Sequence, residues 1–263
     1  MNQASDQWCL IDSHVHLDMT YRNNPGQLVW LKDEGCLPIS WAFAPRVDSI
    51  SDLRHYLDYQ KMIFREINRH ENRCYFLAGI HPRNIPGDLK SELVRELVLP
   101  SLDDDYCLGL GEIGLEKNTS HEREILLAQL DLAEEVVDRG KIFGIHTPRR
   151  NKDVVTRETL KLLKPYLVFR EQIVIDHCNK NTIQSVLKSG LWVGITLNPI
   201  KTSFQDLSEI TDTYLGSLGR IMLNTDSGGS FYDDLVRFYH SQEFDQEVRR
   251  QLASRSAARF FGL

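Results

Sequence analysis

Two histidines stand one residue apart in the segment IDSHVHLD, residues 11–18. Side chains alternate between the two faces of an extended strand, so His14 and His16 should point to the same side. Ile11 and Val15 are apolar, as a buried strand requires. Two imidazoles on one face of such a strand are either ordinary polar residues at its end or half of a metal site, because neutral imidazole is a common metal ligand.

Further residues that could bind a metal or move a proton stand where later apolar segments end. They are His81 in GIHPRN, Glu112 in GLGEIGLE, His146 in FGIHTP, His177 in VIDHCN and Asp226 in LNTDSG. In a parallel (β/α)8 barrel the carboxyl ends of all strands meet at one mouth, where active sites lie. In such a barrel these side chains would share one pocket with His14 and His16.

Each of these residues also has a structural explanation when it is taken alone. A single histidine at the end of a strand is more often a hydrogen-bonded structural residue. Glu112 lies between glycines and could accept backbone hydrogen bonds, and Asp226 could be a turn residue or a helix cap. Their joint position argues for a shared site, since five of the nine histidines stand at such strand ends. The other four, His55, His70, His121 and His240, lie in helical segments that look exposed.

Short apolar segments alternate with longer amphipathic ones along the whole chain, as in a parallel sheet covered by helices. Eight such units in 263 residues match the usual size of a (β/α)8 TIM barrel, and we expect one domain over residues 1–263. An open doubly wound sheet is the alternative, disfavoured because no glycine-rich phosphate loop follows the first strand. The expected strands are 8–15, 37–44, 74–81, 107–113, 141–146, 173–178, 191–197 and 221–225.

The clearest expected helix covers residues 120–139. Thr119 and Glu122 have the spacing of a capping box, and Gly140 is a stop signal. Leu126, Leu130, Ala133 and Val137 would share the buried face. A shorter helical insertion follows the first strand, with Asn24 as its cap, Pro25 in its first turn and Gly35 at its end.

Composition indicates a globular protein that stays in a reducing compartment. The net charge of −6, from 31 basic and 37 acidic residues, argues against a broad basic surface that coats nucleic acid. Five dispersed cysteines without a CxxC pair make a disulfide framework improbable. The first ten residues lack the pattern of a signal peptide, and no apolar run is long enough to span a membrane. We therefore expect a cytoplasmic protein without a membrane partner, and its oligomeric state stays open.

The ordered motifs IDSHVHLD, GIHPRN, GLGEIGLE, FGIH, IDHC and NTDSG resemble those of the TatD-like metal-dependent hydrolases. This family belongs to the amidohydrolase superfamily, and its members are TIM-barrel, two-metal phosphodiesterases often described as deoxyribonucleases. The resemblance implies two divalent ions of Zn, Mn, Mg or Fe, since the mixture of imidazole and carboxylate does not decide between them. It extends from the first expected strand to the eighth.

The resemblance also implies a role for each residue. His14, His16 and Asp226 would bind one ion, His146 and His177 the second, and Glu112 would bridge the two. Asp226 would also accept a proton from the attacking water, which makes Asp226 and Glu112 the catalytic residues. His81 matches a position near the substrate phosphate, and Arg149 is a second candidate for substrate binding.

The sequence departs from the family pattern around these residues. The departures are Asn224 in place of an acidic residue, Pro148 in place of arginine with Arg149 one residue later, Cys178-Asn179-Lys180 in place of Phe-Ser-Gly, and Glu116 in place of aspartate. The expected metal ligands are intact, whereas several positions that would face the substrate have changed.

Three functions follow as hypotheses. The first is a TatD-like phosphodiesterase or deoxyribonuclease that acts on DNA or on a small phosphoester. The second keeps the barrel and the metals but hydrolyses a small ester, lactone or amide. The third is a pathway or partner protein that retains the barrel without catalysis.

Overall fold

Eight parallel strands form the centre of the molecule, each within or overlapping one of the expected apolar segments. The computed structural model describes residues 9–69 and 73–263. Residue Trp8 of the expected strand 8–15 lies outside this range. The strands are β1 (Leu10–Val15), β2 (Cys36–Trp41), β3 (Tyr75–Ala78), β4 (Cys107–Gly114), β5 (Ile142–His146), β6 (Ile173–Ile175), β7 (Trp192–Thr196) and β8 (Ile221–Asn224).

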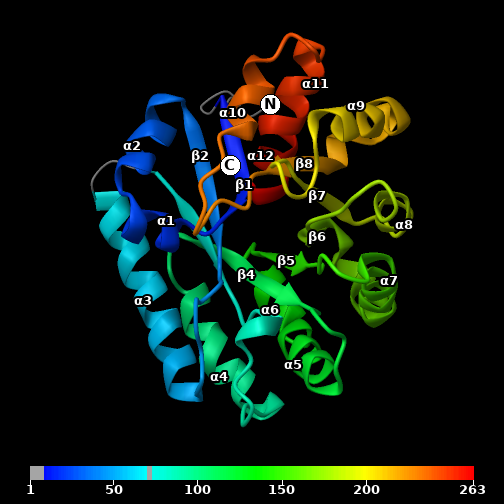
Figure 1. Cartoon of the computed structure of the whole chain (residues 1–263). Coiled ribbons are helices and arrows are strands. Elements are labelled where there is room, and N and C mark those ends of the chain that lie inside the picture. Colours follow the sequence, from blue (N-terminus) through cyan, green and yellow to red (C-terminus); the bar gives the residue numbers. More distant parts are fainter. Residues whose placement is uncertain (1–8, 70–72) are drawn as a thin grey trace.

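The strands pair in the order of the sequence, β1 to β8, and the sheet curls into a barrel (Figure 1). Backbone hydrogen bonds also join the two outer strands at their carboxyl ends. Asp226 N–H donates to the His14 carbonyl at 3.0 Å, and His16 N–H donates to the Ser227 carbonyl at 2.6 Å. The expected (β/α)8 barrel is therefore confirmed, and the open-sheet alternative is wrong.

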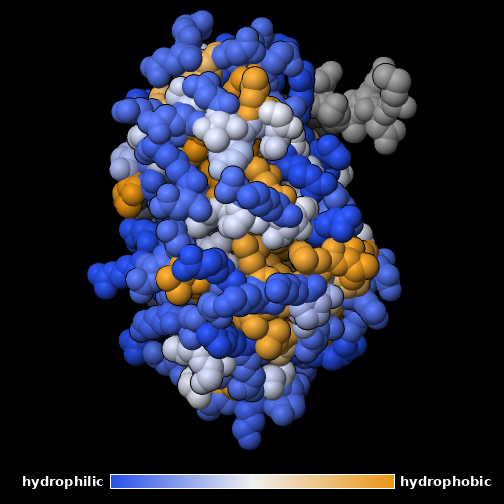
Figure 2. Space-filling model, turned by 90° about the vertical axis from the view of Figure 1, so that its right-hand side faces the viewer, coloured by the Kyte–Doolittle hydropathy of each residue, from blue (hydrophilic) through white to orange (hydrophobic). Residues whose placement is uncertain are grey.

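Helices surround the barrel and follow the strands in alternation (Figure 1). They are α1 (Leu17–Asn23), α2 (Gly26–Asp33), α3 (Ile50–Arg69), α4 (Ser91–Leu102), α5 (Ser120–Leu130), α6 (Ala133–Asp138), α7 (Lys152–Leu162), α8 (Ile183–Lys188), α9 (Phe204–Thr213), α10 (Asp234–His240), α11 (Gln246–Arg250) and α12 (Ser256–Phe261). Hydrophilic side chains predominate on the face that carries α7, α8 and α9, with separate apolar patches between them (Figure 2). None of the described helices is both long enough and apolar enough to span a bilayer.

Apolar side chains fill the barrel below its carboxyl-terminal mouth. Leu37, Ile39 and Trp41 belong to one buried cluster, as the two-residue repeat of β2 requires. Phe260 and Phe261 of α12 pack into the same cluster. This cluster occupies the interior of the barrel, and polar side chains at the ends of the strands lie above it at the mouth.

The expected helix over residues 120–139 is wrong in its middle, because the chain forms a turn at Asp131 and Leu132 between α5 and α6. This turn shifts the phase of the second half, so Val136 is buried while Val137 is only partly so. Gly140, with a φ of +69°, follows α6 as expected. A φ in this range favours glycine.

Thr119 caps α5 as expected, but the capping box is incomplete. The Thr119 hydroxyl accepts from Glu122 N–H at 3.2 Å. The Glu122 carboxylate instead accepts from the backbone N–H groups of Lys117 at 2.9 Å and Asn118 at 2.7 Å. It thereby stabilises the loop before the helix.

The insertion after β1 contains two helices, α1 and α2, rather than one. Asn24 accepts from Gly26 N–H at 3.2 Å at the start of α2, and Gly35 adopts a φ of +65° beyond its end. The expected boundaries are therefore close but shifted, because Pro25 rather than Asn24 is the N-cap of α2 and Glu34 rather than Gly35 is its C-cap.

Gly109 in β4 provides a test of strand packing. It pairs with Ile142 in β5, and a Cβ at Gly109 would lie 1.9 Å from the Ile142 carbonyl oxygen. Because backbone cannot move aside as a flexible side chain can, we expect Gly109→Ala to lower the free energy of unfolding by about 3 kcal/mol. Urea unfolding measures this change. In the control Gly87→Ala the new methyl group meets nothing within 4 Å, so its effect should stay within about 1 kcal/mol. Equal midpoints for the two variants would contradict the prediction.

Candidate metal centre

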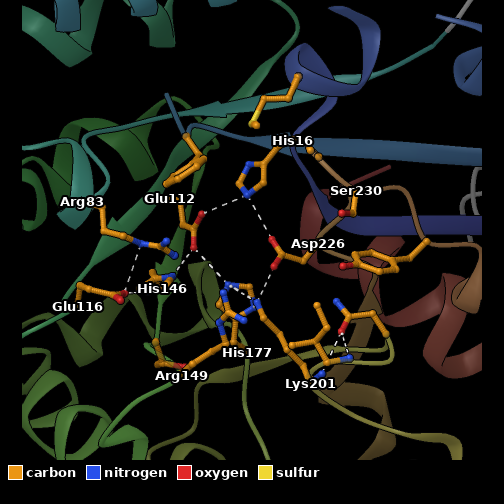
Figure 3. A pocket seen from close by; sticks show the side chains of 18 residues that line it. His16, Arg83, Glu112, Glu116, His146, Arg149, His177, Lys201, Asp226 and Ser230 are labelled. Carbon is orange, nitrogen blue, oxygen red and sulfur yellow. Dashed lines mark hydrogen bonds and ion pairs between the residues drawn. The ribbon is translucent and has the colours of Figure 1, made fainter. Parts of the chain in front are cut away.

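The side chains expected to carry chemistry meet at the carboxyl-terminal mouth of the barrel. They line or underlie a cavity of about 220 Å³ (Figure 3). They lie on or just after their strands, with His14 and His16 at β1, Glu112 at β4, His146 at β5, His177 at β6 and Asp226 at β8. The barrel therefore brings together residues from both ends of the chain, as the sequence predicted.

Glu112 is the centre of this cluster. Four histidine Nε2 atoms lie around its carboxylate, at 3.5 Å for His14, 3.8 Å for His16, 3.6 Å for His81 and 3.3 Å for His177. His146 Nδ1 forms a hydrogen bond to the same carboxylate. Burial alone would raise the pKa of Glu112, but the surrounding histidines outweigh it and hold the pKa well below its usual range. A buried carboxylate with this many neighbours suits a bridging position.

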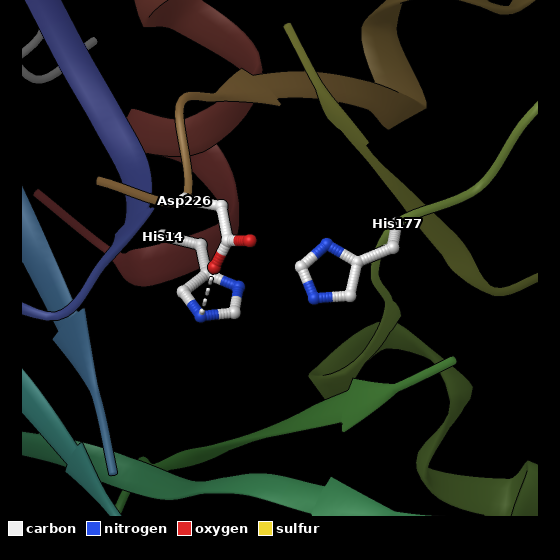
Figure 4. A group of neighbouring side chains, drawn as sticks. All are labelled: His14, His177 and Asp226. Carbon is white, nitrogen blue, oxygen red and sulfur yellow. Dashed lines mark ion pairs between the residues drawn. The ribbon is translucent and has the colours of Figure 1, made fainter. Parts of the chain in front are cut away.

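Three groups of side chains have ligand atoms within 4.8 Å of one another. They are His14–His177–Asp226 (Figure 4), His14–His16–Glu112 and His81–Glu112–His146. His14 and Glu112 each belong to two groups, so the three groups form one continuous cluster. In this cluster His177 lies with His14 and Asp226, while His146 lies with His81.

The residues present fit a metal ion. His14 Nε2 is buried and makes no hydrogen bond. It faces the Glu112 carboxylate at 3.5 Å and the Asp226 carboxylate at 3.8 Å. A buried imidazole nitrogen without a partner is costly, and a bound cation would satisfy it.

Asp176 holds the His14 ring in this orientation. Its Oδ2 accepts a hydrogen bond from His14 Nδ1, so Nε2 is the nitrogen that faces the cluster. Trp41 stacks on the same ring at a centroid distance of 4.2 Å. A carboxylate that orients a ligating histidine is a recurrent feature of metal sites. We did not predict this role from the sequence, although Asp176 stands directly before His177 in IDHC.

Asp176 itself is fixed by two other residues. Asn224 Nδ2 donates to Asp176 Oδ1 at 2.8 Å, so the asparagine that departs from the family pattern supports a carboxylate from β6. Gly194 makes space, because a Cβ there would lie 2.1 Å from the same oxygen. Burial opposes ionisation, but His177 and the hydrogen bond from His14 outweigh it and hold the pKa of Asp176 well below its usual range.

Local backbone conformation brings His177 to the same site as Asp176, although the two residues are adjacent in sequence. Strand geometry would send Asp176 and His177 to opposite faces. His177 instead has a φ of +56°, and its Nδ1 lies 3.3 Å from Asp176 Oδ2. The backbone of Asp226 is also in the left-handed region, with a φ of +55°. Non-glycine residues rarely adopt this region, and they concentrate at functional sites.

Asp226 contacts two cationic or ligating groups at the rim. His16 Nε2 lies 3.2 Å from its Oδ1, and Lys201 Nζ lies 2.6 Å from its Oδ2. His16 Nδ1 is 3.0 Å from the Trp41 carbonyl, which leaves Nε2 to face the cavity. Lys201 Nζ is also 3.0 Å from His177 Nδ1. Lys201 was not expected at the site, because it follows the Asn198–Pro199 turn after β7 and no strand-end signal marks it.

His146 differs from the other expected ligands because both of its nitrogens form hydrogen bonds to carboxylates. Nδ1 bonds to Glu112, and Nε2 lies 2.9 Å from Glu116 Oε2. This hydrogen bond is the main cause that lowers the pKa of Glu116 to about 2. A metal-binding role for His146 requires it to give up one of the two contacts.

His81 presents a protonated ring nitrogen to the cluster, whereas a metal ligand presents an unprotonated one. Its Nδ1 accepts from Arg83 N–H at 3.0 Å, which puts the proton of the neutral ring on Nε2. Burial lowers the pKa of His81 to about 4, so the ring is neutral at pH 7. Its buried Nε2 has no hydrogen-bond partner. His81 is not among the residues that line the cavity, and its Nε2 faces the Glu112 carboxylate at 3.6 Å, so its role near a substrate stays a prediction.

The remaining predicted residues lie at the rim or away from the site. Arg149 is exposed and lines the cavity. Arg83 also lines it, 3.6 Å from Glu116. The other described histidines contribute nothing to the cluster, as expected for His55, His121 and His240, and His70 lies outside the described residues.

Comparisons with known proteins agree with this geometry. A family model described as TatD related DNase matches residues 11–228. An uncharacterized metal-dependent hydrolase of Methanocaldococcus jannaschii is 29% identical over 210 residues, which are 78% of this chain and 80% of that protein. A TatD-like protein from Archaeoglobus fulgidus has a TM-score of 0.73 and 30% identity over 96% of this chain and 100% of its own.

More distant structures share the barrel alone. A 5-carboxyvanillate decarboxylase from Novosphingobium aromaticivorans, complexed with manganese, has a TM-score of 0.64 at 13% identity and covers 100% of both chains. At this identity the likeness concerns only the fold. The family model and the archaeal relatives are therefore the matches that bear on chemistry.

Proposed function

This chain belongs to the TatD related DNase family and is a metal-dependent hydrolase of that family, and on this premise we propose that it hydrolyses phosphodiester bonds at a two-metal centre. Its substrate in this proposal is DNA or a small phosphoester. The observation that carries the proposal is the convergence of His14, His16, Glu112, His146, His177 and Asp226 on one buried cluster at the barrel mouth.

In the proposed centre His14, His16 and Asp226 would hold one ion, His146 and His177 would hold the other, and Glu112 would contribute to both positions. Two divalent ions at such a site supply charge for both the attacking and the leaving oxygen and lower the pKa of water. The donor set of imidazole and carboxylate accepts Zn, Mn, Fe or Mg, so the metal must be identified by analysis.

The protein groups around the cluster divide the remaining work. Asp226 is the proposed proton acceptor, because it borders the cavity and is partly exposed. Burial opposes its ionisation, but the hydrogen bond from His16 and the charge of Lys201 outweigh it and hold the pKa of Asp226 well below its usual range. His81 donates its Nε2–H to a phosphate oxygen, and Arg149 contacts the substrate at the rim.

The size of the cavity favours one alternative. At about 220 Å³ the cavity is smaller than typical ligand pockets of about 300–1,000 Å³. Hydrolysis of a small ester, lactone or amide at the same metals is therefore the second candidate.

A substrate comparison on one metal-loaded preparation separates these functions. Protein reconstituted with Zn or Mn is incubated with single-stranded DNA and with a panel of small phosphodiesters, esters, lactones and amides. We expect cleavage of phosphodiesters that stops on chelation and returns when the metal is restored. Metal-dependent cleavage of only the esters, lactones or amides would replace the phosphodiesterase by the second candidate.

Metal content tests the enzyme against the non-catalytic alternative. Purified protein should contain bound metal, and added Zn or Mn should raise its melting temperature, because a ligand that binds only the folded state stabilises it. Protein without metal and without this stabilisation would favour a partner protein that has lost catalysis.

A further inference from the structure

The cavity of about 220 Å³ at the barrel mouth is here called the metal pocket. A second cavity, here called the side pocket, adjoins it near the carboxyl ends of β6 and β7. Its volume is about 190 Å³. The two cavities share Arg149, His177, Ile200 and Lys201 in their walls. Figure 3 shows Arg149 and Lys201 beside His177 at the same edge of the metal pocket. A molecule bound at the metal centre can therefore extend into the side pocket.

The two cavities differ in their charged groups. Glu112, Glu116 and Asp226 line the metal pocket together with Arg83, Arg149 and Lys201. The side pocket is lined by Arg149, Lys152 and Lys201, and no aspartate or glutamate is among the described residues of its wall. Lys201 is already paired with Asp226 at 2.6 Å, so Arg149 and Lys152 are the cations that suit an anion in this cavity.

The lysines of the side pocket are held in place by the fold. Lys152 Nζ donates to the His177 carbonyl at 2.7 Å and to the Thr147 hydroxyl at 3.0 Å. Lys201 lies in a turn fixed by Asn198, whose Oδ1 accepts from Lys201 N–H at 3.0 Å. The Asn198 amide also donates to the Thr225 carbonyl at 2.9 Å, which ties this turn to β8. Such preorganisation lowers the entropic cost of binding.

Arg149 is the cation of this pocket that is free to contact a ligand. It is exposed, and within residues 9–69 and 73–263 its guanidinium has no ion pair or hydrogen bond. Ile200 stands beside it at the boundary of the two cavities with 60% of its surface exposed. It offers an apolar contact for whatever part of a ligand connects the two cavities.

We propose that the side pocket binds a second phosphate of the substrate whose scissile phosphodiester lies at the metal centre. This inference rests on the proposed function and narrows it. The substrate then carries at least two phosphate groups, as a nucleic acid strand or a small bisphosphorylated molecule does. An isolated neutral ester, lactone or amide would leave the side pocket empty.

Matched substrates that differ by one phosphate test this inference. Thymidine 5′-(4-nitrophenyl phosphate) is compared with the same compound carrying a 3′-phosphate, and thymidine 3′-(4-nitrophenyl phosphate) with its 5′-phosphorylated form. The additional phosphate should raise kcat/KM about tenfold in one of the two orientations, as expected for a charge-assisted contact. Equal kcat/KM within both pairs would overturn the inference and leave the proposed function standing.

Substitutions at the rim locate the contact. Arg149→Gln should remove most of this preference, and Arg149→Glu should reverse it. The matched control is Arg150→Gln, because Arg150 is an exposed neighbour that lines neither cavity. It should retain the wild-type preference. A preference that survives both Arg149 substitutions would contradict the assignment.

Equilibrium binding separates a failure of this inference from a failure of the proposed function. If the metal-loaded protein cleaves none of the four substrates, the proposed phosphodiesterase is wrong. Titration calorimetry then still tests the side pocket, since thymidine 3′,5′-bisphosphate should bind about tenfold more tightly than both thymidine 5′-monophosphate and thymidine 3′-monophosphate. Equal affinities would overturn the inference.

The source of the second phosphate is distinguished by a base-free competitor. If 1,3-propanediol bisphosphate competes as well as thymidine 3′,5′-bisphosphate, the side pocket serves a small bisphosphate. Weaker competition by about tenfold assigns it to a nucleic acid strand. Either result supports a phosphate site, whereas failure of both compounds to bind contradicts it.

Discussion

Replacing Glu112 with glutamine is expected to deplete both metal positions of the proposed centre. The glutamine side chain keeps the size of glutamate but has no charge, and its amide offers one acceptor oxygen instead of two. Since four histidine Nε2 atoms lie within 3.8 Å of this carboxylate, no other described side chain has a comparable position in the cluster. We expect the apparent metal affinity to fall on the order of 100-fold or more, and hydrolysis to fall with it.

Elemental analysis of dialysed protein, together with competition against a chelator, measures this effect. Glu112→Asp retains the charge one methylene further from the histidines and should bind metal with intermediate affinity. His55→Ala is the matched control, because His55 is exposed on α3 and outside the cluster, and it should leave metal content unchanged. Two ions per chain in Glu112→Gln or Glu112→Ala would show that Glu112 is not the bridge.

Replacing Asp176 with asparagine should weaken metal binding although Asp176 is not itself an expected ligand. Its two carboxylate oxygens accept from His14 Nδ1 and from Asn224 Nδ2. An asparagine has one acceptor oxygen, so it can satisfy one of these donors but not both. Either His14 loses the acceptor that orients its ring, or Asn224 loses its acceptor and no longer holds the side chain at position 176 in place. In both cases we expect metal affinity to fall about 10- to 100-fold.

Gly194→Ala tests the position of the Asp176 carboxylate without changing its charge. The new methyl group would lie 2.1 Å from Asp176 Oδ1 and must displace it, while the charge is retained. Metal affinity should therefore fall in this variant as well. In the control Gly216→Ala nothing lies within 4 Å of the new methyl group, and metal affinity should stay at the wild-type value. Affinity is measured by chelator competition beside the unfolding of the metal-free protein. Wild-type metal affinity in Asp176→Asn would show that Asp176 only supports packing.

The arrangement of strands could be predicted because the apolar segments are short, continuous and separated by amphipathic ones. Each expected strand contains or overlaps an observed strand, from β1 to β8, in the described part of the chain. The internal break at Asp131 and Leu132 could not be predicted, because the helical period continues on both sides of it.

The expected ligands could be predicted as a group from one rule, that carboxyl ends of parallel strands converge. Asp176 and Lys201 could not be found in this way. Asp176 lies two residues after the inward-facing Val174, and His177 joins it at the cluster through its own left-handed conformation, which strand alternation does not anticipate. Lys201 reaches Asp226 from the turn after β7, and its position depends on hydrogen bonds of Asn198.

The sequence by itself determined the barrel and the kind of chemistry at its mouth, because the hydrophobic period and the residue types at strand ends are local properties. The tertiary structure alone decided which nitrogen of each histidine faces the cavity. Those choices depend on partners distant in sequence, such as Asp176 for His14 and the Trp41 carbonyl for His16. It also decided that carboxylates line only the first of two adjoining pockets, whereas Arg149 and Lys201 line both.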